Sequence, residues 1–485
     1  MQPLEDSPLA GAARFLDRPA VIDGDRAWSW RQVHEAAIAL SHRLGDASAV
    51  SNLCASRLGF LVTFIAALRN RCLIVLPPST SSADLAAVHR PHARPVAAGD
   101  PGTCPELAGE RGRAAPPFLS CRPEWRAPSA ADRALAWTPA WDGVAVLLHT
   151  SGSTGDPQAQ PKTLRHLATG ALLLGERLAK EVEGGLAAID RIVCSVPPQH
   201  MFGLECSVML PLLHGTPILD RRPLLPADVR AAFAGGPRGV WIATPMHLRS
   251  LVQTAESIPS CSAAVVSTMP LGQLVARQSE PLLGAPVLEI YGSTETGALA
   301  MRRTARESRW LPMSGVRLER VEGASLAHGA HFASPMKLLD ELVLEANGSF
   351  LLLGRQADLI KIAGRRASLA GLNLLLQELP GLDDGVFYLP DTGNPAERLC
   401  LMYAGLPLDR AKVRRWLRAR LDPVFLPRDL IRLDRLPRND SGKLPRQSLE
   451  LAYAAWQMQA PTQSQERPGA AGASAAAAPA RIAAS

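Results

Sequence analysis

A run of small and hydroxyl-bearing residues is the part of this sequence whose spacing best suggests chemistry. Four hydroxyl residues and two glycines lie within six positions: Thr150, Ser151, Gly152, Ser153, Thr154 and Gly155. Such a loop presents backbone N–H groups and hydroxyls to a ligand, and no bulky side chain blocks the approach. A polyphosphate suits this chemistry. The alternative is a Ser/Gly-rich surface loop, and the Walker spacing G-x-x-x-x-G-K-[ST] is absent.

A second candidate segment adds a carboxylate to the same mixture of residue types. Its residues follow the apolar stretch 286–290 and are Tyr291, Gly292, Ser293, Thr294, Glu295, Thr296 and Gly297. A glutamate beside a phosphate loop suits Mg²⁺, because this ion takes hard oxygen ligands from few carboxylates plus phosphate. The alternative is a helix N-terminus, with Ser293 or Thr294 as the cap and Glu295 in the first turn.

Two charged segments follow later in the chain. In the first, residues 354–366, Ile360 and Ile362 alternate with Lys361, which is typical of a strand, although an exposed linker is the alternative. In the second, residues 437–446, proline and glycine fix a turn that carries Lys443. A solvated basic loop is the alternative there.

Composition and length define the class of protein in which these segments lie. The 485 residues suffice for two or three domains, and 47% hydrophobic with 20% charged residues is ordinary for a globular protein. The longest apolar run, 59–68, is too short to span a bilayer. The acidic start lacks a signal-peptide core, so we expect a cytoplasmic location. Eight cysteines without a C-x-x-C pair indicate reduced thiols, and the net charge of +7 suits anionic partners.

Strands and helices alternate around the two candidate loops. After a hairpin at 19–30 and helices at 31–44 and 57–70, a strand is expected at 72–76, whereas 77–140 gives few signals. From 142 to about 300 we expect strands at 143–148, 191–196, 216–219, 239–243, 262–267 and 286–290, with helices at 163–183, 203–214, 226–234, 245–256 and 271–280. This alternation predicts a doubly wound α/β sheet, whose ligands gather at the carboxyl ends of the strands.

The last third of the chain has a different pattern. Residues 300–353 are β-rich, with a hairpin expected between 341–344 and 349–353 across Asn347-Gly348. A smaller unit follows, with strands at 386–390 and 399–403 and helices at 409–421 and 445–456. The sequence therefore predicts an N-terminal domain at 1–354, a C-terminal domain at 355–456 and a disordered Ala/Pro-rich tail at 457–485.

Taken in order, the four segments resemble the motifs of the adenylate-forming ligase superfamily, which includes acyl- and aryl-CoA synthetases, luciferases and the adenylation domains of peptide synthetases. The resemblance covers roughly residues 15–455. It implies a large N-terminal domain of doubly wound sheets with a β-rich subdomain, and a small mobile α+β C-terminal domain. It also implies two half-reactions, in which a carboxylate attacks the α-phosphate of ATP and a thiol then takes the acyl group from the adenylate.

The resemblance assigns roles residue by residue. The loop 150–155 would hold the β- and γ-phosphates, and Gly292 and Ser293 belong to the same nucleotide site. Thr294 would touch the α-phosphate, Glu295 would bind Mg²⁺ and Tyr291 would lie against adenine. Asp340 and Arg355 have the spacing of the family's ribose-binding pair. Lys443 would reach the substrate carboxylate and the α-phosphate, where a cation offsets the charge developing in the transition state.

Three departures from the family pattern affect single residues. The phosphate loop normally continues with Gly-x-Pro-Lys, but here Gln158 takes the lysine position and a lysine returns only at Lys162. The hinge position, usually Asp or Lys, is Ala357, followed by Asp358. The family's Tyr/Thr-Gly-Asp around the ribose carboxylate is here Leu338-Leu339-Asp340.

The acid substrate is suggested by the segment before Gly215. Peptide-synthetase domains place an aspartate near the position of Met201 and Phe202, but here no acid occurs until Glu205. Burying a substrate ammonium without a partner would be costly, which argues against amino acids. Residues 198–203 resemble the aryl- and acyl-CoA ligases, in which His200 would gate the pocket, although a core histidine is the alternative. We expect an aromatic or medium-chain acid, in a cavity lined by His200, Met201, Phe202, Thr244, Val266, Met269 and Glu289.

The thiol acceptor, either CoA or a carrier-protein phosphopantetheine, is suggested by a basic helix. Six cations and no acid lie within 410–420: Arg410, Lys412, Arg414, Arg415, Arg418 and Arg420. Such a helix could dock an acidic acyl carrier protein or the 3′-phosphate of CoA, and a solvated helix face is the alternative. For the whole chain, the alternative to a ligase is a degenerate nucleotide-binding homologue without turnover. A luciferase-like oxygenase has no distinguishing residue in this sequence.

Overall fold

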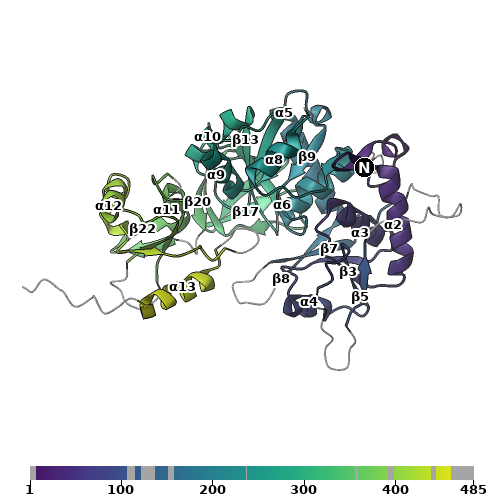
Figure 1. Ribbon diagram of the computed structural model, residues 1–485, viewed down its shortest axis with the longest axis horizontal. Helices are drawn as coiled ribbons and strands as arrows, with labels where there is room; N and C mark the ends of the chain where they lie inside the picture. The colour runs from purple at the N-terminus through teal and green to yellow at the C-terminus, as the bar shows by residue number, and fades with distance from the viewer. Residues whose placement is uncertain are drawn as a thin grey trace, which may run out of the picture.

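Two large sheets with helices packed between and around them form most of the molecule, and smaller sheets follow at the C-terminal end (Figure 1). The computed structural model describes residues 7–105, 107, 115–121, 137–150, 158–235, 238–355, 359–376, 378–390, 398–438 and 444–459. Helices cover both faces of the larger sheet, so the predicted doubly wound α/β fold is confirmed.

The first sheet has six strands, and its central ones are parallel. Their order is β6 (Phe118–Ser120), β5 (Pro95–Gly99), β3 (Ala49–Asn52), β4 (Leu73–Leu76), β7 (Val144–Thr150) and β8 (Gln158–Thr163), with only β7 and β8 antiparallel. The strands expected at 72–76 and 143–148 are β4 and β7. Together with α4 (Ser82–His89), β5 and β6 occupy part of the stretch 77–140, for which few elements were predicted.

The second sheet has nine strands, and six neighbouring strands in its middle are parallel. Their order is β15 (Leu311–Pro312), β14 (Gly297–Arg303), β13 (Val287–Ser293), β12 (Cys261–Val266), β11 (Gly239–Ala243), β9 (Arg191–Cys194), β10 (Ile218–Leu219), β1 (Pro19–Asp23) and β2 (Arg26–Ser29). Each strand predicted between 191 and 290 is present. The predicted hairpin around Asp23-Gly24 is the antiparallel pair of β1 and β2.

The helices α2, α3, α4 and α5 begin at capping side chains. Ser29 accepts a hydrogen bond from the Gln32 N–H, and Gln32 caps in return; Thr163 accepts from the His166 N–H. Each cap satisfies an otherwise unpaired N–H of the first turn. The helices are α2 (Trp30–Leu44), α3 (Arg57–Arg69), α5 (Leu164–Glu181), α6 (Met201–Leu204), η4 (Glu205–Met209), α7 (Leu210–His214), α8 (Pro226–Phe233), α9 (Pro245–Thr254) and α10 (Gln273–Leu283), with short turns at η1 (Ala13–Phe15) and η3 (Leu186–Ala188).

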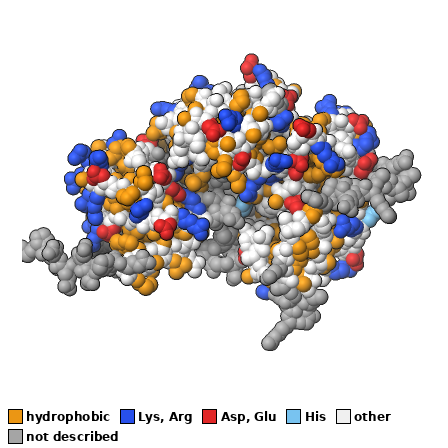
Figure 2. Space-filling view, viewed as in Figure 1, with side chains coloured by type: hydrophobic (Ala, Val, Ile, Leu, Met, Phe, Trp, Pro, Cys, Tyr) orange, Lys and Arg blue, Asp and Glu red, His pale blue; other side chains and the backbone are white. Residues whose placement is uncertain are grey.

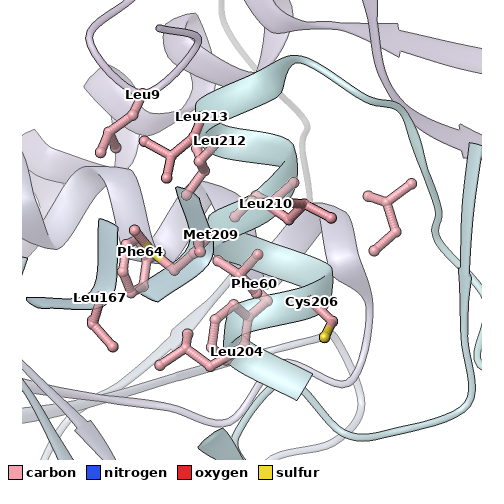
Figure 3. Close-up of a cluster of buried hydrophobic side chains, with 14 of the residues drawn as sticks. Leu9, Phe60, Phe64, Leu167, Leu204, Cys206, Met209, Leu210, Leu212 and Leu213 are labelled. Atoms are coloured by element: carbon pink, nitrogen blue, oxygen red, sulfur yellow. The ribbon is translucent and has the colours of Figure 1, made fainter. Parts of the chain in front are cut away.

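The apolar run at 59–68 forms the centre of the main core. It lies in α3, which is apolar on all sides and therefore buried all round. In Figure 3, Phe60 and Phe64 of this helix lie beside Leu204, Cys206 and Met209 of the continuous helical segment α6–η4–α7. The phenyl rings of Phe60 and Phe64 stack with centroids 6.3 Å apart. Burial of this segment from both sides fixes the first residues of α6, which the sequence assigned to the acid pocket.

The β-rich region consists of two small antiparallel sheets. One contains β16 (Arg317–Val321), β17 (Ala324–His328) and β18 (Met336–Lys337), and the other contains β19 (Asp340–Leu344) and β20 (Phe350–Arg355). The predicted hairpin across Asn347-Gly348 is confirmed, with Gly348 at a φ of +82° that favours glycine. The predicted boundary after residue 354 lies at the last residue of β20.

The C-terminal unit, residues 359–459, has its own apolar core. It contains β21 (Leu359–Ile362), β22 (Arg365–Ser368), α11 (Leu369–Leu376), β23 (Asp384–Tyr388), β24 (Cys400–Ala404), α12 (Arg410–Arg418), η6 (Pro423–Phe425), β25 (Asp429–Arg432) and α13 (Arg446–Gln459). Figure 1 shows this unit beside α9, α10 and β20. The strand predicted around Lys361 is β21. Helix α13 continues through residues 457–459, which the sequence assigned to the tail.

The cysteine side chains lie mostly in the interior of the molecule. All eight cysteines are free thiols, and all except Cys104 are buried. Cys54 and Cys121 lie on either side of the Thr63 hydroxyl, with their sulfurs 3.7 and 3.1 Å from its oxygen. Among the described residues, no helix combines the length and apolar character needed to cross a membrane.

Candidate active site

The two candidate loops follow strands in different sheets, and a lysine side chain connects them. β7 ends at Thr150 in the six-stranded sheet, and β13 ends at Ser293 in the nine-stranded sheet. Lys162 of β8 donates a hydrogen bond from Nζ to the backbone carbonyl of Glu295. The hairpin β7–β8 therefore contacts the turn that carries Thr294 and Glu295. Ser151, Gly152, Ser153, Thr154 and Gly155 lie outside the described residues, as does the side chain of Thr150.

The turn 293–297 has a compact hydrogen-bonded geometry. The Ser293 N–H donates to Thr296 Oγ1 at 3.1 Å, and the Thr296 N–H donates to Ser293 Oγ at 3.3 Å. A Cβ on Gly292 would lie 2.1 Å from the Gly297 carbonyl oxygen, so only glycine fits there. β14 continues directly from Gly297, so the alternative of a helix N-terminus is wrong. Thr294 and Glu295 are half-buried at the tip of a β-hairpin.

The predicted adenine and ribose residues lie close together. Tyr291 donates a hydrogen bond from its hydroxyl to Asp340 Oδ2 at 2.9 Å, and its ring packs against Trp310 and Phe350 with both centroids 5.7 Å away. Asp340 and Arg355 are directly opposite each other in the pairing of β19 with β20. The fifteen-residue spacing thus brings their backbones together across a hairpin, although the side chain of Arg355 lies outside the described residues. Lys443 and Ala357 also lie outside them.

Among the described residues, Glu295 is the carboxylate that the sequence predicts as a ligand of Mg²⁺. In the described part of the chain, no group of three or more His, Cys, Asp or Glu side chains is arranged to hold a metal ion. Glu295 is half-buried at the tip of its turn. A magnesium ion there would complete its coordination with phosphate oxygens and water, as this ion commonly does at nucleotide sites.

A buried polar cluster contacts this turn, and no motif of the sequence indicates it. Lys162 is 5% exposed and Glu205 is 3% exposed. Glu205 Oε1 accepts the Ala298 N–H at 3.4 Å, and burial raises the pKa of its carboxyl to about 7, while the Lys162 ammonium opposes this shift. Burial lowers the pKa of Lys162, which the carboxylates of Glu205 and Glu295 oppose. The available signal was a single acid within an otherwise apolar helical stretch.

The predicted gate of the acid pocket lies at the start of α6. His200 is the residue before the helix and is half-buried, whereas Met201 and Phe202 are each 9% exposed. Gly203 is required at this point because a Cβ there would lie 1.9 Å from the Pro197 carbonyl oxygen. The Met201 side chain extends toward Gly297, since a Cβ on that glycine would lie 3.2 Å from Met201 Cε. Met201 therefore reaches the turn that carries Glu295.

Two of the other predicted pocket residues, Val266 and Glu289, do not share one face of the sheet with Met201 and Phe202. The ends of β11, β12 and β13 are in register, with Ala243 beside Val266 and Val266 beside Glu289. Val266 packs into the core beneath α8, α9 and α10, whereas Met201 and Phe202 belong to the core on the opposite face of the sheet. Neighbouring strand residues point to opposite faces, so Val266 and Glu289 cannot line one cavity with Met201. Ile290 and Ala298 lie on the Met201 side.

Two of these residues have local structural partners. Glu289 accepts hydrogen bonds from Arg302 Nε and Nη2 at 2.9 and 2.7 Å, from Thr304 Oγ1 at 2.7 Å and from the Leu271 N–H at 2.8 Å. Its carboxylate is thus engaged within the fold. Thr244 precedes α9 and shares a hydrogen bond with His247 Nδ1 at 2.8 Å. Met269 is half-buried beyond the end of β12.

Comparisons with known proteins agree with this geometry. The sequence model of the family described as AMP-binding enzyme matches residues 10–323. The chain is 26% identical over 300 residues to 4-coumarate--CoA ligase of Cereibacter sphaeroides, covering 61% of this chain and 69% of that protein. It is 26% identical over 239 residues to enterobactin synthase component F of Escherichia coli K12, covering 36% of this chain and 18% of that protein.

A solved structure extends the similarity to nearly the full length. The O-succinylbenzoate coenzyme A synthetase (MenE) of Bacillus subtilis, in complex with AMP, superimposes with a TM-score of 0.75 at 18% identity, covering 91% of this chain and 97% of that chain. At this identity the likeness demonstrates the fold alone. The family match covers more than half of the chain and includes both strand-end loops. The chain therefore belongs to the AMP-binding enzyme family, and the resemblance recognised in its four motifs is confirmed.

Proposed function

We propose that this protein activates a carboxylic acid with ATP and transfers the acyl group to a thiol. In the first step a carboxylate oxygen attacks the α-phosphorus, the bond to the bridging oxygen breaks and pyrophosphate leaves. In the second step a thiolate attacks the acyl carbonyl and AMP leaves. The observation that carries the proposal is the contact of Lys162 with the Glu295 carbonyl, because it joins the β7–β8 hairpin to the turn with Thr294 and Glu295.

The chain supplies binding and electrostatic groups for the first step. Thr150 and the loop after it would hold the β- and γ-phosphates through hydroxyls and N–H groups. Tyr291 and Asp340 would hold adenine and ribose from positions that already share a hydrogen bond. A Mg²⁺ ion at Glu295 would neutralise phosphate charge. Thr294 would contact the α-phosphate, and Lys443 would stabilise charge there as the new bond forms.

The proposed substrate is an aromatic or medium-chain acid rather than an amino acid. Glu205 is the acid that follows Met201 and Phe202 in the sequence, but its carboxylate is buried near Lys162 and accepts the Ala298 N–H. It is therefore engaged within the protein and cannot serve a substrate ammonium without leaving Lys162 uncompensated. The apolar side chains of Met201 and Phe202 suit an apolar acid, and one relative is a 4-coumarate--CoA ligase.

The proposed acceptor is either CoA or a phosphopantetheine arm on an acidic carrier protein. Asp409 caps α12, whose buried residues are Val413 and Leu417, so the cationic side chains of this helix lie on its outer face. Figure 2 shows a gathering of Lys and Arg side chains at the edge of the molecule where Figure 1 places α12. Similarity to a peptide-synthetase component, enterobactin synthase component F, adds support for a carrier protein.

The proposal is tested by pyrophosphate release with benzoic, cinnamic and fatty acids, before and after adding CoA or carrier protein. We expect acid-dependent release with one class of acid. Replacing Lys443 with alanine should lower that release about a hundredfold or more while ATP still binds, because the cation acts mainly in the transition state. Lys337→Ala, which removes an exposed lysine of β18, is the control and should have no effect.

The alternative is a homologue that binds nucleotide without turnover, and the glutamine at position 158 is the observation that favours it. Calorimetric ATP binding without pyrophosphate release for any acid would support this alternative. Acid-dependent release that is normal in Lys443→Ala would contradict the mechanism proposed for the first step.

A further inference from the structure

Two buried charged residues near the Glu295 turn, Lys162 and Glu205, have no role in the function proposed so far. Lys162 comes from β8, and Glu205 comes from the π-helical turn η4 in the middle of the α6–η4–α7 segment. The two residues are 5% and 3% exposed. The Lys162 ammonium donates to the Glu295 carbonyl, and Glu205 Oε1 accepts the N–H of Ala298, three residues further along. Both side chains therefore hold the same β-hairpin turn.

The space around the Glu205 carboxylate is formed by two glycines. A Cβ on Gly297 would lie 2.5 Å from Glu205 Oε1, and a Cβ on Gly170 of α5 would lie 2.9 Å from the same atom. Both distances are too short for a real side chain, so each glycine is needed for the carboxylate to occupy its position. The requirement involves three elements, α5, η4 and the start of β14. The carboxylate is thus an integral part of the turn's packing.

Glu205 is the main buried carboxylate that favours the ammonium of Lys162. The carboxylates of Glu205 and Glu295 both favour the ammonium, and Glu205 has the larger effect. Glu295 is half-buried at the exposed side of the turn, where the proposed Mg²⁺ would compete for it. His331 also approaches Gly170, but burial lowers its pKa to about 4, so it remains neutral near pH 7. Burial also lowers the pKa of His166 on α5, which lies near Lys162.

We propose that Lys162 is the phosphate-binding lysine of this enzyme, in place of the residue lost at Gln158, and that Glu205 is the positioning residue that holds Lys162 at the Glu295 turn. Lys162 would contact the polyphosphate of ATP from the side of the Glu295 carbonyl. Glu205 would act only through Lys162, by compensating its charge in the buried site. The inference rests on the proposed function, since it assigns two further residues to the same nucleotide site.

Three variants test this assignment: Lys162→Met, Glu205→Gln and the double substitution. Glu205→Gln is nearly isosteric and its amide oxygen still accepts the Ala298 N–H, so the fold should be preserved. We expect each single variant to raise the KM for ATP about tenfold, as for the loss of one charge contact, with the KM for the acid unchanged. Lys162→Arg should restore part of the ATP affinity. In the Lys162→Met background, Glu205→Gln should have no further effect.

A matched control is Glu280→Gln, which removes a carboxylate of α10 paired with Arg303 at the opposite end of β14 from the Glu295 turn. Its KM for ATP should equal that of the wild-type protein. The assignment is overturned if Glu205→Gln leaves the KM for ATP unchanged. It is also overturned if the KM for the acid rises instead, or if the effects of the two single substitutions add in the double variant.

The same variants separate failure of this inference from failure of the proposed function. If the wild-type protein releases no pyrophosphate with any acid, the proposed function fails. Calorimetric ATP affinity still decides the inference in that case, because nucleotide binding requires no turnover. Weaker binding in both single variants, without additivity, supports the pair, and unchanged binding in both overturns it.

Discussion

Glu205 and Glu289 are both 3% exposed, but their carboxylates have different surroundings. Glu289 has four hydrogen-bond donors from Arg302, Thr304 and Leu271, so its charge is compensated where it stands. Glu205 has one long backbone hydrogen bond and an ammonium nearby, and its pKa is raised to about 7. A buried carboxylate with many donors is typical of a structural role. One with few donors beside a buried cation is typical of a functional site.

At the residue scale, His34 makes stability depend on pH. It is fully buried on α2, its Nε2–H donates to the Pro8 carbonyl at 2.7 Å, and burial lowers its pKa from 6.5 to about 4. Below pH 6.5 the unfolded chain therefore binds the proton more readily than the folded one. The free energy of unfolding should fall as the pH is lowered from 6.5 toward 4, and His34 alone should account for about 2 kcal/mol by pH 5.

Urea unfolding at pH 7 and pH 5, followed by tryptophan fluorescence, measures this dependence. Because burial also lowers the pKa values of His247 and His331 to about 4, some acid sensitivity should remain in any single variant. The raised pKa of Glu205 acts in the opposite direction, since a carboxyl that is protonated in the fold favours folding as the pH falls. His34→Gln should reduce the difference in the free energy of unfolding between pH 7 and pH 5. His42→Gln, an exposed position on the same helix, should leave it unchanged, and equal effects of the two would contradict the argument.

At the element scale, α12 separates a buried stripe from a cationic face. Val413 and Leu417 lie four residues apart and pack into the core of the C-terminal unit, whereas Arg414, Arg415 and Arg418 are exposed. The structure thus agrees with the helix predicted at 409–421. A helix with this arrangement can dock an anionic partner without disturbing its own packing, because the charged side chains contribute little to the core.

Replacing Arg414, Arg415 and Arg418 with glutamate tests the docking proposal. Transfer to an acidic carrier protein should fall about tenfold or more, because like charges would then face each other. Adenylate formation should be unchanged, since these three arginine side chains are exposed and do not pack into the core of the C-terminal unit. Pyrophosphate release and thioester formation are measured separately, with CoA as the second acceptor. Reversal of Arg230 and Arg238, exposed cations of the N-terminal region, is the control, and unchanged transfer to both acceptors would rule out docking at α12.

At the scale of the whole molecule, an ionic contact joins the C-terminal unit to the N-terminal region. Asp384 of β23 accepts two hydrogen bonds from Arg438 at 2.8 and 2.7 Å, and Arg249 of α9 lies 3.5 Å from the same carboxylate. These side chains are only 16–17% exposed. Beside them lies a cavity of about 150 Å³ lined by residues of α9, α10, α11 and β23. Because this contact is incompletely packed, it suits a C-terminal unit that docks reversibly on the N-terminal region.

Arg249→Gln should weaken this docking while leaving the Asp384–Arg438 pair intact. We expect the free energy of docking to become less favourable by about 1–2 kcal/mol, as for the loss of a half-desolvated ionic contact. This change shifts the ratio of docked to undocked molecules by roughly tenfold. Small-angle X-ray scattering should then report a larger radius of gyration. Arg230→Gln, on the neighbouring helix α8, removes an exposed contact with Glu256 and should leave the scattering curve unchanged. Identical curves for wild type and Arg249→Gln would argue against a role for Arg249 in docking.

The sequence alone determined the order of the elements and the class of the fold. The alternation of strands and helices from 142 to 300 depends on local apolar periodicity, and each predicted strand there is present. The hairpins at Asp23-Gly24 and Asn347-Gly348 were predictable because their turns require particular residues. The family was recognisable for the same reason, since its loops follow strand ends and contain residue types that phosphate binding requires.

Only the tertiary structure decided which side chains meet. Val266 and Glu289 were assigned to the pocket with Met201, but a shift of one residue along a strand places a side chain on the opposite face of the sheet. Lys162 is distant in sequence from both Glu295 and Glu205, and their proximity depends on how two sheets and the α6–η4–α7 segment pack together. Such contacts between distant segments leave no periodic signal in the sequence. Periodicity determined the elements of this protein, and three-dimensional packing determined the charges that face one another in its site.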